Sequence, residues 1–208
     1  MASRNFISSY IIRHFFKLLS LQKKANMADI EEKVKGSHVI ELITVANDFC
    51  IFTEGLEKYD KSDILGYFQK VLPLLYIKGS LTPFVPAVED MVPEHYITEE
   101  NWDNIYSQFK EKLGEDDMFG LVIHDEIYGD KAKKASIAES LADIYQDLKD
   151  FLVLYQQNTS IARQNAVYEC RRLFETRWGH RLVNVHAAIH KILFSSKIED
   201  NTLPGQEI

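Results

Sequence analysis

Two arginines and two aspartates are the side chains of this sequence with the clearest binding chemistry. Arg177 and Arg181 lie four residues apart in the last long helical stretch, and Asp143 and Asp147 lie four residues apart in an earlier one. Residues four apart share one face of a helix. A guanidinium group makes forked hydrogen bonds to carboxylates and phosphates. These four side chains are therefore the candidate ligand-binding residues.

The arginines need an explanation because they fall within or close to an apolar arc of their helix. At about 100° per residue, that arc contains several small and large apolar side chains, namely Ala166, Cys170, Leu173, Phe174, Ala188 and Ile192. Arg163, Arg177 and Arg181 lie in or beside it. A buried guanidinium is costly unless it is paired and hydrogen-bonded.

Three explanations for the arginines stand side by side. In the first, they form ion pairs with acids of a neighbouring helix, for which the candidates are Glu54, Asp143, Asp147 and Asp150. In the second, Gly179 resets the helical register and Arg181 turns outward. In the third, Arg177 or Arg181 lines a pocket that receives an anionic ligand. Residues 160–197 carry a net charge of +5, which makes this region the natural counterpart of an acidic helix.

The acidic helix is the best-specified element of the chain and spans residues 136–157. Ser136 is a good N-cap, and Glu139 three residues later predicts a capping box. Apolar residues at helical spacing form one stripe, while Asp143, Asp147 and Asp150 share a narrow arc nearly opposite. The pattern predicts a helix with one buried side and one carboxylate-lined side.

Apolar periodicity predicts four further helices. They cover residues 37–58 with Ser37 as cap, 62–78 with Ser62 as cap, 98–113 with Thr98 as cap, and 161–194 with a reset at Trp178–Gly179. Pro73 lies inside the second of them and should bend it, since proline removes a backbone hydrogen bond. The short link at 158–160 predicts antiparallel neighbours. The expected fold is all-α, a single-domain bundle of about five main helices.

One long segment of the chain has no helical period. Residues 115–134 hold two glycines and six acids, and we expect a long ordered loop there. Loops of this length in compact domains are often functional. A calcium-binding loop requires acids at alternating positions, a central glycine and a closing glutamate, and that spacing is absent.

The charge is uneven along the chain. Residues 1–28 carry +5 and no acid, whereas the whole chain carries −7, which leaves −12 for the rest. Arg13 and His14 interrupt the apolar run of this leader, which disfavours a secretory signal and a membrane-spanning helix. It is either a surface-bound amphipathic leader helix or an appendage upstream of a natural start at Met27. The expected organisation is a basic leader at 1–28, a helical domain at 29–195 and a flexible tail at 196–208.

No motif of a known catalytic or cofactor site occurs in the sequence. There is no nucleophile elbow, phosphate loop, zinc-protease motif or dinucleotide fingerprint, so no cofactor or metal is predicted. His186 and His190 could share a metal, but their place away from the main apolar stripe favours exposed or hydrogen-bonded histidines. Cys50 and Cys170 are predicted to be buried free thiols in a reducing compartment. A reactive Cys170 is the alternative, since its two neighbours are arginines.

Four strings of sequence together resemble a bacterial family of uncharacterised helical domains, the domain of unknown function numbered 5063. The strings are VIELITVANDFC at 39–50, LGYFQKVLPLLY at 65–76, IAESLADIYQDLKDF at 137–151 and FETRWGHRLVNVHAAIH at 174–190. The resemblance covers about residues 37–195. It implies a helical, cytoplasmic bacterial protein and supplies no activity, ligand or site residue.

Two functions of different class remain open. The leading hypothesis is a non-enzymatic interaction module, in which an exposed acidic face or the 115–134 loop docks a partner protein or a second copy of the chain. The acidic body argues against nucleic acid as a partner. The alternative is a protein that binds or hydrolyses a small anion, a phosphate or carboxylate metabolite, with Arg177 and Arg181.

Overall fold

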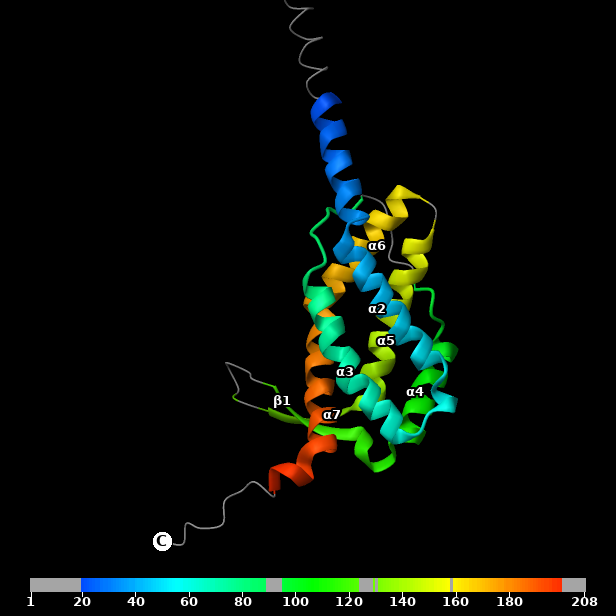
Figure 1. Cartoon of the computed structure of the whole chain (residues 1–208), viewed down its shortest axis with the longest axis vertical. Helices are drawn as coiled ribbons and strands as arrows, with labels where there is room; N and C mark the ends of the chain where they lie inside the picture. The colour runs from blue at the N-terminus through cyan, green and yellow to red at the C-terminus, as the bar shows by residue number, and fades with distance from the viewer. Residues whose placement is uncertain (1–19, 89–94, 124–128, 130, 158, 200–208) are drawn as a thin grey trace, which may run out of the picture.

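A computed structural model describes residues 20–88, 95–123, 129, 131–157 and 159–199, and within them it confirms an all-α bundle (Figure 1). The long helices are α2 (Ser37–Glu54), α3 (Lys61–Ser80), α4 (Glu99–Leu113), α5 (Ile137–Gln156), α6 (Ser160–Leu173) and α7 (Gly179–Glu199). The short ones are η1 (Leu56–Lys58), η2 (Gly114–Asp117) and the π-helical turn η3 (Phe174–Trp178). Residues 20–34 form a further helix that protrudes from one end of the bundle.

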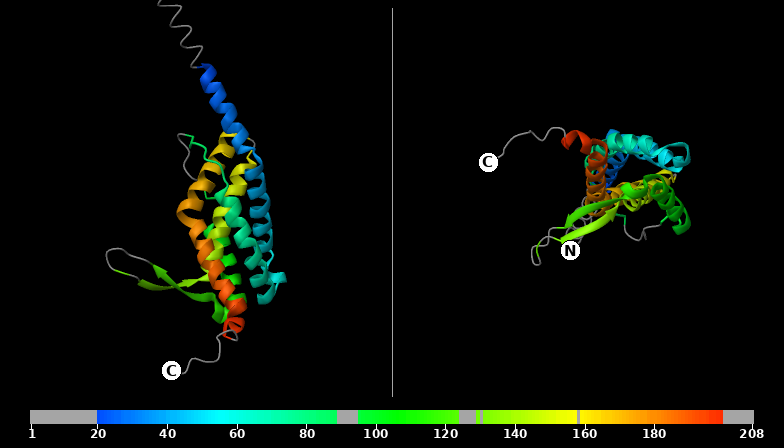
Figure 2. Two further views of the ribbon diagram at one scale, coloured as in Figure 1. Left: turned by 60° about the vertical axis from the view of Figure 1, so that its left-hand side comes forward. Right: turned by 90° about the horizontal axis from the view of Figure 1, so that it is seen from below.

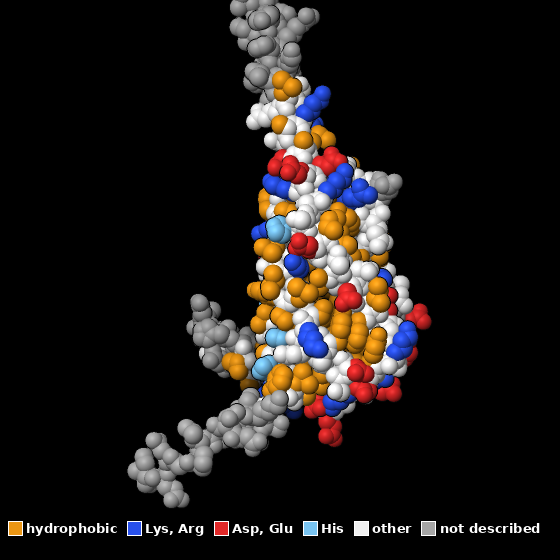
Figure 3. Space-filling model, viewed as in Figure 1, with side chains coloured by type: hydrophobic (Ala, Val, Ile, Leu, Met, Phe, Trp, Pro, Cys, Tyr) orange, Lys and Arg blue, Asp and Glu red, His pale blue; other side chains and the backbone are white. Residues whose placement is uncertain are grey.

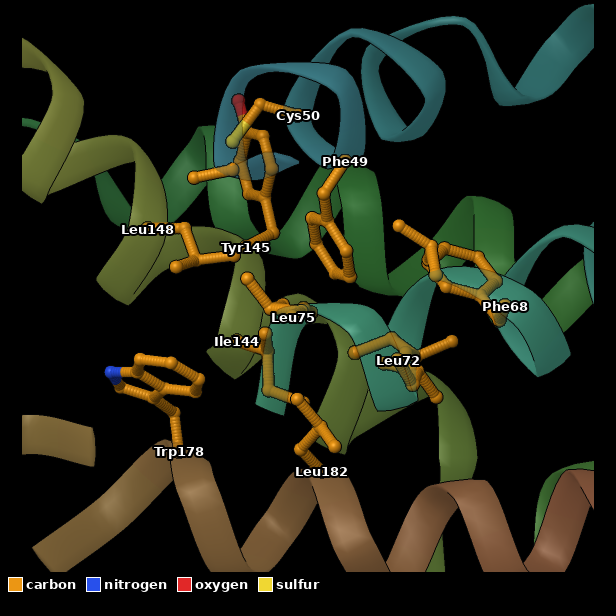
Figure 4. Close-up of a cluster of buried hydrophobic side chains, with 14 of the residues drawn as sticks. Phe49, Cys50, Phe68, Leu72, Leu75, Ile144, Tyr145, Leu148, Trp178 and Leu182 are labelled. Atoms are coloured by element: carbon orange, nitrogen blue, oxygen red, sulfur yellow. The ribbon is translucent and has the colours of Figure 1, made fainter. Parts of the chain in front are cut away.

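Helix α5 lies at the centre of the bundle. It packs against α2, α4, α6 and α7, while α3 packs against α2 and α7. Its apolar stripe meets apolar side chains of its neighbours in the core shown in Figure 4, where Leu75 of α3, Ile144 of α5 and Leu182 of α7 converge. The predicted amphipathic helix at 136–157 is therefore the element around which the others are arranged.

The helix starts follow local capping chemistry, with two corrections. Thr98 and Ser136 are caps as expected, since their hydroxyls accept from the backbone N–H groups three residues later. Gly36 rather than Ser37 precedes α2, and Asp60 rather than Ser62 caps α3. Asp60 is preferred because it forms a reciprocal capping box, accepting from Asp63 N at 2.9 Å and donating its own N–H to the Asp63 carboxylate at 3.4 Å.

Pro73 lies inside α3 and leaves the carbonyl of Gln69 without its helical donor. His186 Nε2 of α7 lies 3.2 Å from that carbonyl oxygen, so an N–H of the imidazole replaces the missing donor. His190 Nδ1 lies 3.1 Å from the amide nitrogen of the same Gln69. The two histidines are hydrogen-bonded, as expected, and the described residues contain no group of three side chains suited to hold a metal ion.

The segment at 115–134 was wrongly predicted to be only a loop. It contains an antiparallel hairpin of β1 (Met118–Ile123) and β2 (Lys131–Ser136), in which Met118 pairs with Ser136 and Ile123 pairs with Lys131. Figure 2 shows that the two strands extend sideways from the bundle beside α7. Residues 124–128 and 130 lie outside the described residues.

Asp117 fastens this hairpin to the bundle. Its buried carboxylate accepts from Ser136 Oγ at 3.0 Å and from the backbone N–H of Ala138 at 2.8 Å. A carboxylate at the first turn of a helix is favoured by the free N–H groups there. This acid of the 115–134 segment therefore holds the base of the hairpin against the start of α5.

Candidate functional site

The four residues selected from sequence meet in one cluster between α5 and the η3–α7 region. Arg181 Nη1 pairs with Asp143 Oδ2, and Arg177 Nη1 lies 3.3 Å from Asp147 Oδ1. Trp102 Nε1 of α4 donates to Asp143 Oδ1 at 3.0 Å. The first explanation for the arginines, ion pairing with a neighbouring helix, accounts for both of their carboxylate contacts.

The remaining charged groups considered in the sequence have other partners. Glu54 pairs with Lys149 at 2.6 Å and accepts from the Tyr145 hydroxyl at 2.9 Å. The guanidinium of Arg163 lies 6.0 Å from the centre of the Tyr155 ring. Neither Glu54 nor Arg163 thus belongs to the cluster.

A π-helical turn sets the position of the two arginines. The turn η3 ends at Trp178, where the sequence predicted a reset of the register. Gly179 follows directly, and a Cβ there would lie 2.4 Å from the carbonyl oxygen of Phe174, which only glycine avoids. The reset does not turn Arg181 outward, because its side chain is only one-third exposed and pairs with Asp143. The second explanation is therefore wrong.

The carboxylate-lined side of α5 is covered and does not form an exposed acidic face. Asp143 and Asp147 are buried. Asp150 accepts from the backbone N–H groups of Tyr96 at 2.8 Å and Ile97 at 3.1 Å. The helix wheel places these acids opposite the apolar stripe, but α4 and the chain entering it cover Asp143 and Asp150, and η3 contacts Asp147. This part of the leading hypothesis is thus corrected: these acids of α5 do not form the exposed face that the hypothesis requires.

Asp147 is the unusual member of the cluster. Its side chain is 1% exposed, and neither carboxylate oxygen has a hydrogen-bond partner. Burial raises the pKa of Asp147 from 3.8 to about 7, against the opposing effect of the Arg177 charge. Near neutral pH this carboxyl group therefore exchanges between the protonated and the ionised form.

The geometry gives the small-anion alternative no support. Each arginine already has a carboxylate partner on α5, so the cluster of two arginines and two aspartates is formally neutral. A phosphate or carboxylate ligand would have to displace Asp143 from Arg181 and approach a second aspartate at the same time. The negative charges of the ligand and the two aspartates would repel one another strongly in this buried site.

A groove of about 720 Å³ lies between β1 and α7, outside this cluster. Residues 118–121 form one wall, and the α7 side chains form the other, with Asn184, Ala187, Ala188, Lys191 and Ile192. In the described part of the chain β1 pairs only with β2, so the peptide groups of its outer edge have no strand partner. Sequence reasoning missed this site because it missed the hairpin.

Comparison of the sequence with known proteins identifies the family. Residues 34–195 match the family described as "Domain of unknown function (DUF5063)". The chain belongs to this family. The crystal structure of protein BF1032 from Bacteroides fragilis is similar to this DUF5063 protein, with 32% sequence identity, a TM-score of 0.68, and coverage of 85% of this chain and 99% of that chain. No curated protein matches the sequence.

The family resemblance expected from the four strings is confirmed, but the DUF5063 description names no activity. The two cysteines and the composition of the described helices bear on two further possibilities. Both thiols are buried and free, and burial raises the pKa of Cys50 to about 12 and that of Cys170 as well. A reactive Cys170 is thus contradicted. None of the described helices combines the length and the apolar content needed to cross a bilayer.

Proposed function

We propose that this DUF5063 protein is a non-enzymatic interaction module that binds an extended segment of another polypeptide in the groove between β1 and α7. The observation that carries the proposal is the unpaired outer edge of β1, which lies directly along this groove. An extended peptide can add to such an edge as a third strand, with backbone hydrogen bonds for affinity and side-chain pockets for specificity.

The hairpin itself favours a third strand. A two-stranded ribbon is only marginally stable in water. Its strand β1 exposes apolar side chains, with Met118 52% and Val122 66% exposed, while Phe119 and Leu121 line the groove. A peptide in the groove would cover Phe119 and Leu121 together with the small surface of Ala187 and add backbone hydrogen bonds to the ribbon.

The charge of the hairpin indicates what kind of segment would bind. The described hairpin residues include Lys131, Lys133 and Lys134 and no acid, although the whole chain carries −7. Lysines on an edge strand deter pairing, so β2 is the protected edge and β1 the open one. Lys191 of α7 adds a cation to the groove, whereas Glu115 and Asp116, which also line it, disfavour acids beside them. We therefore expect a partner segment with apolar residues at alternate positions, and acidic side chains between them where they face lysine.

A second apolar surface is less suited to docking. Figure 3 shows apolar side chains over the face formed by α2 and α3, where Ile51 and Ile77 are more than half exposed. Charged side chains interrupt this face, and it lacks the unpaired backbone that β1 offers. We place the interaction in the bacterial cytoplasm, since buried free thiols suit a reducing compartment and the similar protein BF1032 is bacterial.

The test is a selection of random ten-residue peptides displayed against the full chain, followed by affinity measurement on the selected peptides. We expect alternating apolar and acidic sequences. Ala187→Glu, on the exposed α7 wall of the groove, should weaken their binding by about tenfold or more, because it introduces both bulk and like charge. Ile51→Glu on α2 is the matched control, an exposed apolar residue outside the groove that should leave binding unchanged.

Three outcomes would contradict the proposal. One is that no peptide is selected, and another is that selected peptides bind the wild type and Ala187→Glu equally. The third is that the wild type is a dimer in solution and that Ala187→Glu makes it monomeric. In that case the groove is occupied by a second copy of the chain rather than by a partner segment.

A further inference from the structure

A small cavity on the far side of Asp147 is separate from the β1–α7 groove. It has a volume of about 110 Å³ and lies between α5, α6 and the chain on either side of residues 89–94, which are outside the described residues. Much of its wall is apolar, with Val88, Phe151, Leu154, Ala166 and Leu173. Asp147 and Asn165 supply polar groups to the same wall.

These two polar side chains are buried and incompletely bonded. Counted as whole residues, Asp147 is 2% exposed and Asn165 is 6% exposed. Both carboxylate oxygens of Asp147 and the amide nitrogen Nδ2 of Asn165 have no hydrogen-bond partner. Asn165 Oδ1 accepts from the backbone N–H of Val88 at 3.0 Å, which fixes the amide with Nδ2 as its free donor. Buried polar groups in native proteins are normally bonded, so an acceptor and a donor here lack a partner.

The other acids of the cavity wall are already bonded. Asp150 accepts from backbone N–H groups through Oδ1, and its Oδ2 lies 3.0 Å from His95 Nδ1. Glu169 accepts from Arg172 Nε at 2.8 Å and from Arg172 Nη2 at 2.5 Å. Among the acids of the wall, Asp147 is thus the one without a hydrogen bond, although Arg177 Nη1 lies 3.3 Å from its Oδ1 as an ion-pair partner.

The charge of the wall selects the ligand. Asp147, Asp150 and Glu169 line the cavity, and the described lining residues include neither lysine nor arginine. Arg177 beside Asp147 and Arg172 beside Glu169 offset two of these three charges, so the wall stays net acidic, which favours a group that donates hydrogen bonds or carries positive charge. A hydrogen-bond acceptor on the same ligand is needed for Asn165 Nδ2.

We propose that this cavity binds a small organic amine that also carries a hydrogen-bond acceptor. The amine donates to the Asp147 carboxylate, the acceptor receives the N–H of Asn165, and the carbon atoms contact the apolar wall. A cavity of 150 Å³ in another protein holds benzene, which has six non-hydrogen atoms, so 110 Å³ limits the ligand to about four or five. A wall that combines polar and apolar groups suits an amino alcohol better than water alone.

Titration with ethanolamine, followed by NMR of the side-chain amide of Asn165, tests this site. We expect a saturable shift of that resonance with a Kd on the order of 1 mM, as suits a ligand of four non-hydrogen atoms. Asp147→Asn should weaken binding by about tenfold or more, because it removes the charge that the amine contacts. Acetate, an anion of the same size, should give no saturable shift.

Asp143→Asn is the matched control, since Asp143 lies one helical turn from Asp147 and does not line the cavity. It should bind ethanolamine as the wild type does. A lack of any saturable shift in the wild type would show that the cavity holds water only and would overturn the proposal. Equal binding by the wild type and Asp147→Asn would overturn it as well. Neither result bears on the peptide groove, which has its own test.

Discussion

Replacing Asp147 with asparagine is expected to stabilise the protein at neutral pH. The pKa of this carboxyl group rises from 3.8 to about 7 on folding, chiefly through burial. The folded chain then holds the proton more tightly than the unfolded chain, so the stability of the wild type falls as the pH rises from about 4 to about 7. Asparagine does not ionise and avoids this loss. We expect a gain of about 2–4 kcal/mol in the free energy of unfolding at pH 7.5 and almost none at pH 4.

Denaturant unfolding of the wild type and the variant at a series of pH values measures this difference. The charged and titratable groups around Asp147 come from several elements, namely Asp143, Asp150, Glu169, Arg177, Arg181 and His95. Asp143→Asn is the control with the opposite sign. It weakens the bonds to Arg181 and Trp102 and should lower stability by about 1–3 kcal/mol. If Asp147→Asn instead destabilises the protein at pH 7.5, its ion pair with Arg177 outweighs the cost of burial.

The fold and the Arg–Asp cluster could be predicted because their signals are local and periodic. Helices of fourteen to twenty-one residues repeat their apolar spacing over several turns, and single caps such as Thr98 mark their starts. The wheel positions of Arg177 and Arg181 required a buried partner, and the acid arc of α5 was the nearest source of one. The positions of these arginines and aspartates could be predicted because the apolar periodicity of each helix fixes which of its faces is buried.

The hairpin and the cavity could not be predicted, since they depend on contacts distant in sequence. Six-residue strands such as KAKKAS at 131–136 offer too little alternation and lack an apolar face. Asn165 has no local feature that marks it, because its free Nδ2 arises only where α6 meets α5 and Val88. The burial of Asp143 likewise depends on Trp102 of α4, which lies forty-one residues away in the sequence.

The contact between α3 and η3 is expected to be the most sensitive point of the core. Trp178 is fully buried in the cluster shown in Figure 4, and its Nε1 donates to the carbonyl oxygen of Cys170 at 3.3 Å. Trp178→Ala should lower the free energy of unfolding by about 3–5 kcal/mol. A Cβ on Gly79 would lie 2.4 Å from the Trp178 ring and 2.7 Å from the Phe174 ring. Gly79→Ala should therefore cost about 1–3 kcal/mol through overpacking.

Denaturant unfolding of Trp178→Ala, Gly79→Ala and the double variant separates two effects of the Gly79 methyl group: its clash with the Trp178 ring and its effect on the helix propensity of α3. Since the Gly79 methyl group would fill space that the missing indole leaves, the double variant should lose less stability than the sum of the single losses, by about 1 kcal/mol or more. Gly66→Ala is the control on the same helix. Its Cβ would meet no atom within 4 Å, so it should stabilise α3 by about 0.5–1 kcal/mol. Strictly additive losses, or a stabilising Gly79→Ala, would show that α3 can move away from η3 without cost. The close approach at Gly79 would then not be what holds the π-helical turn, and with it Arg177, in place.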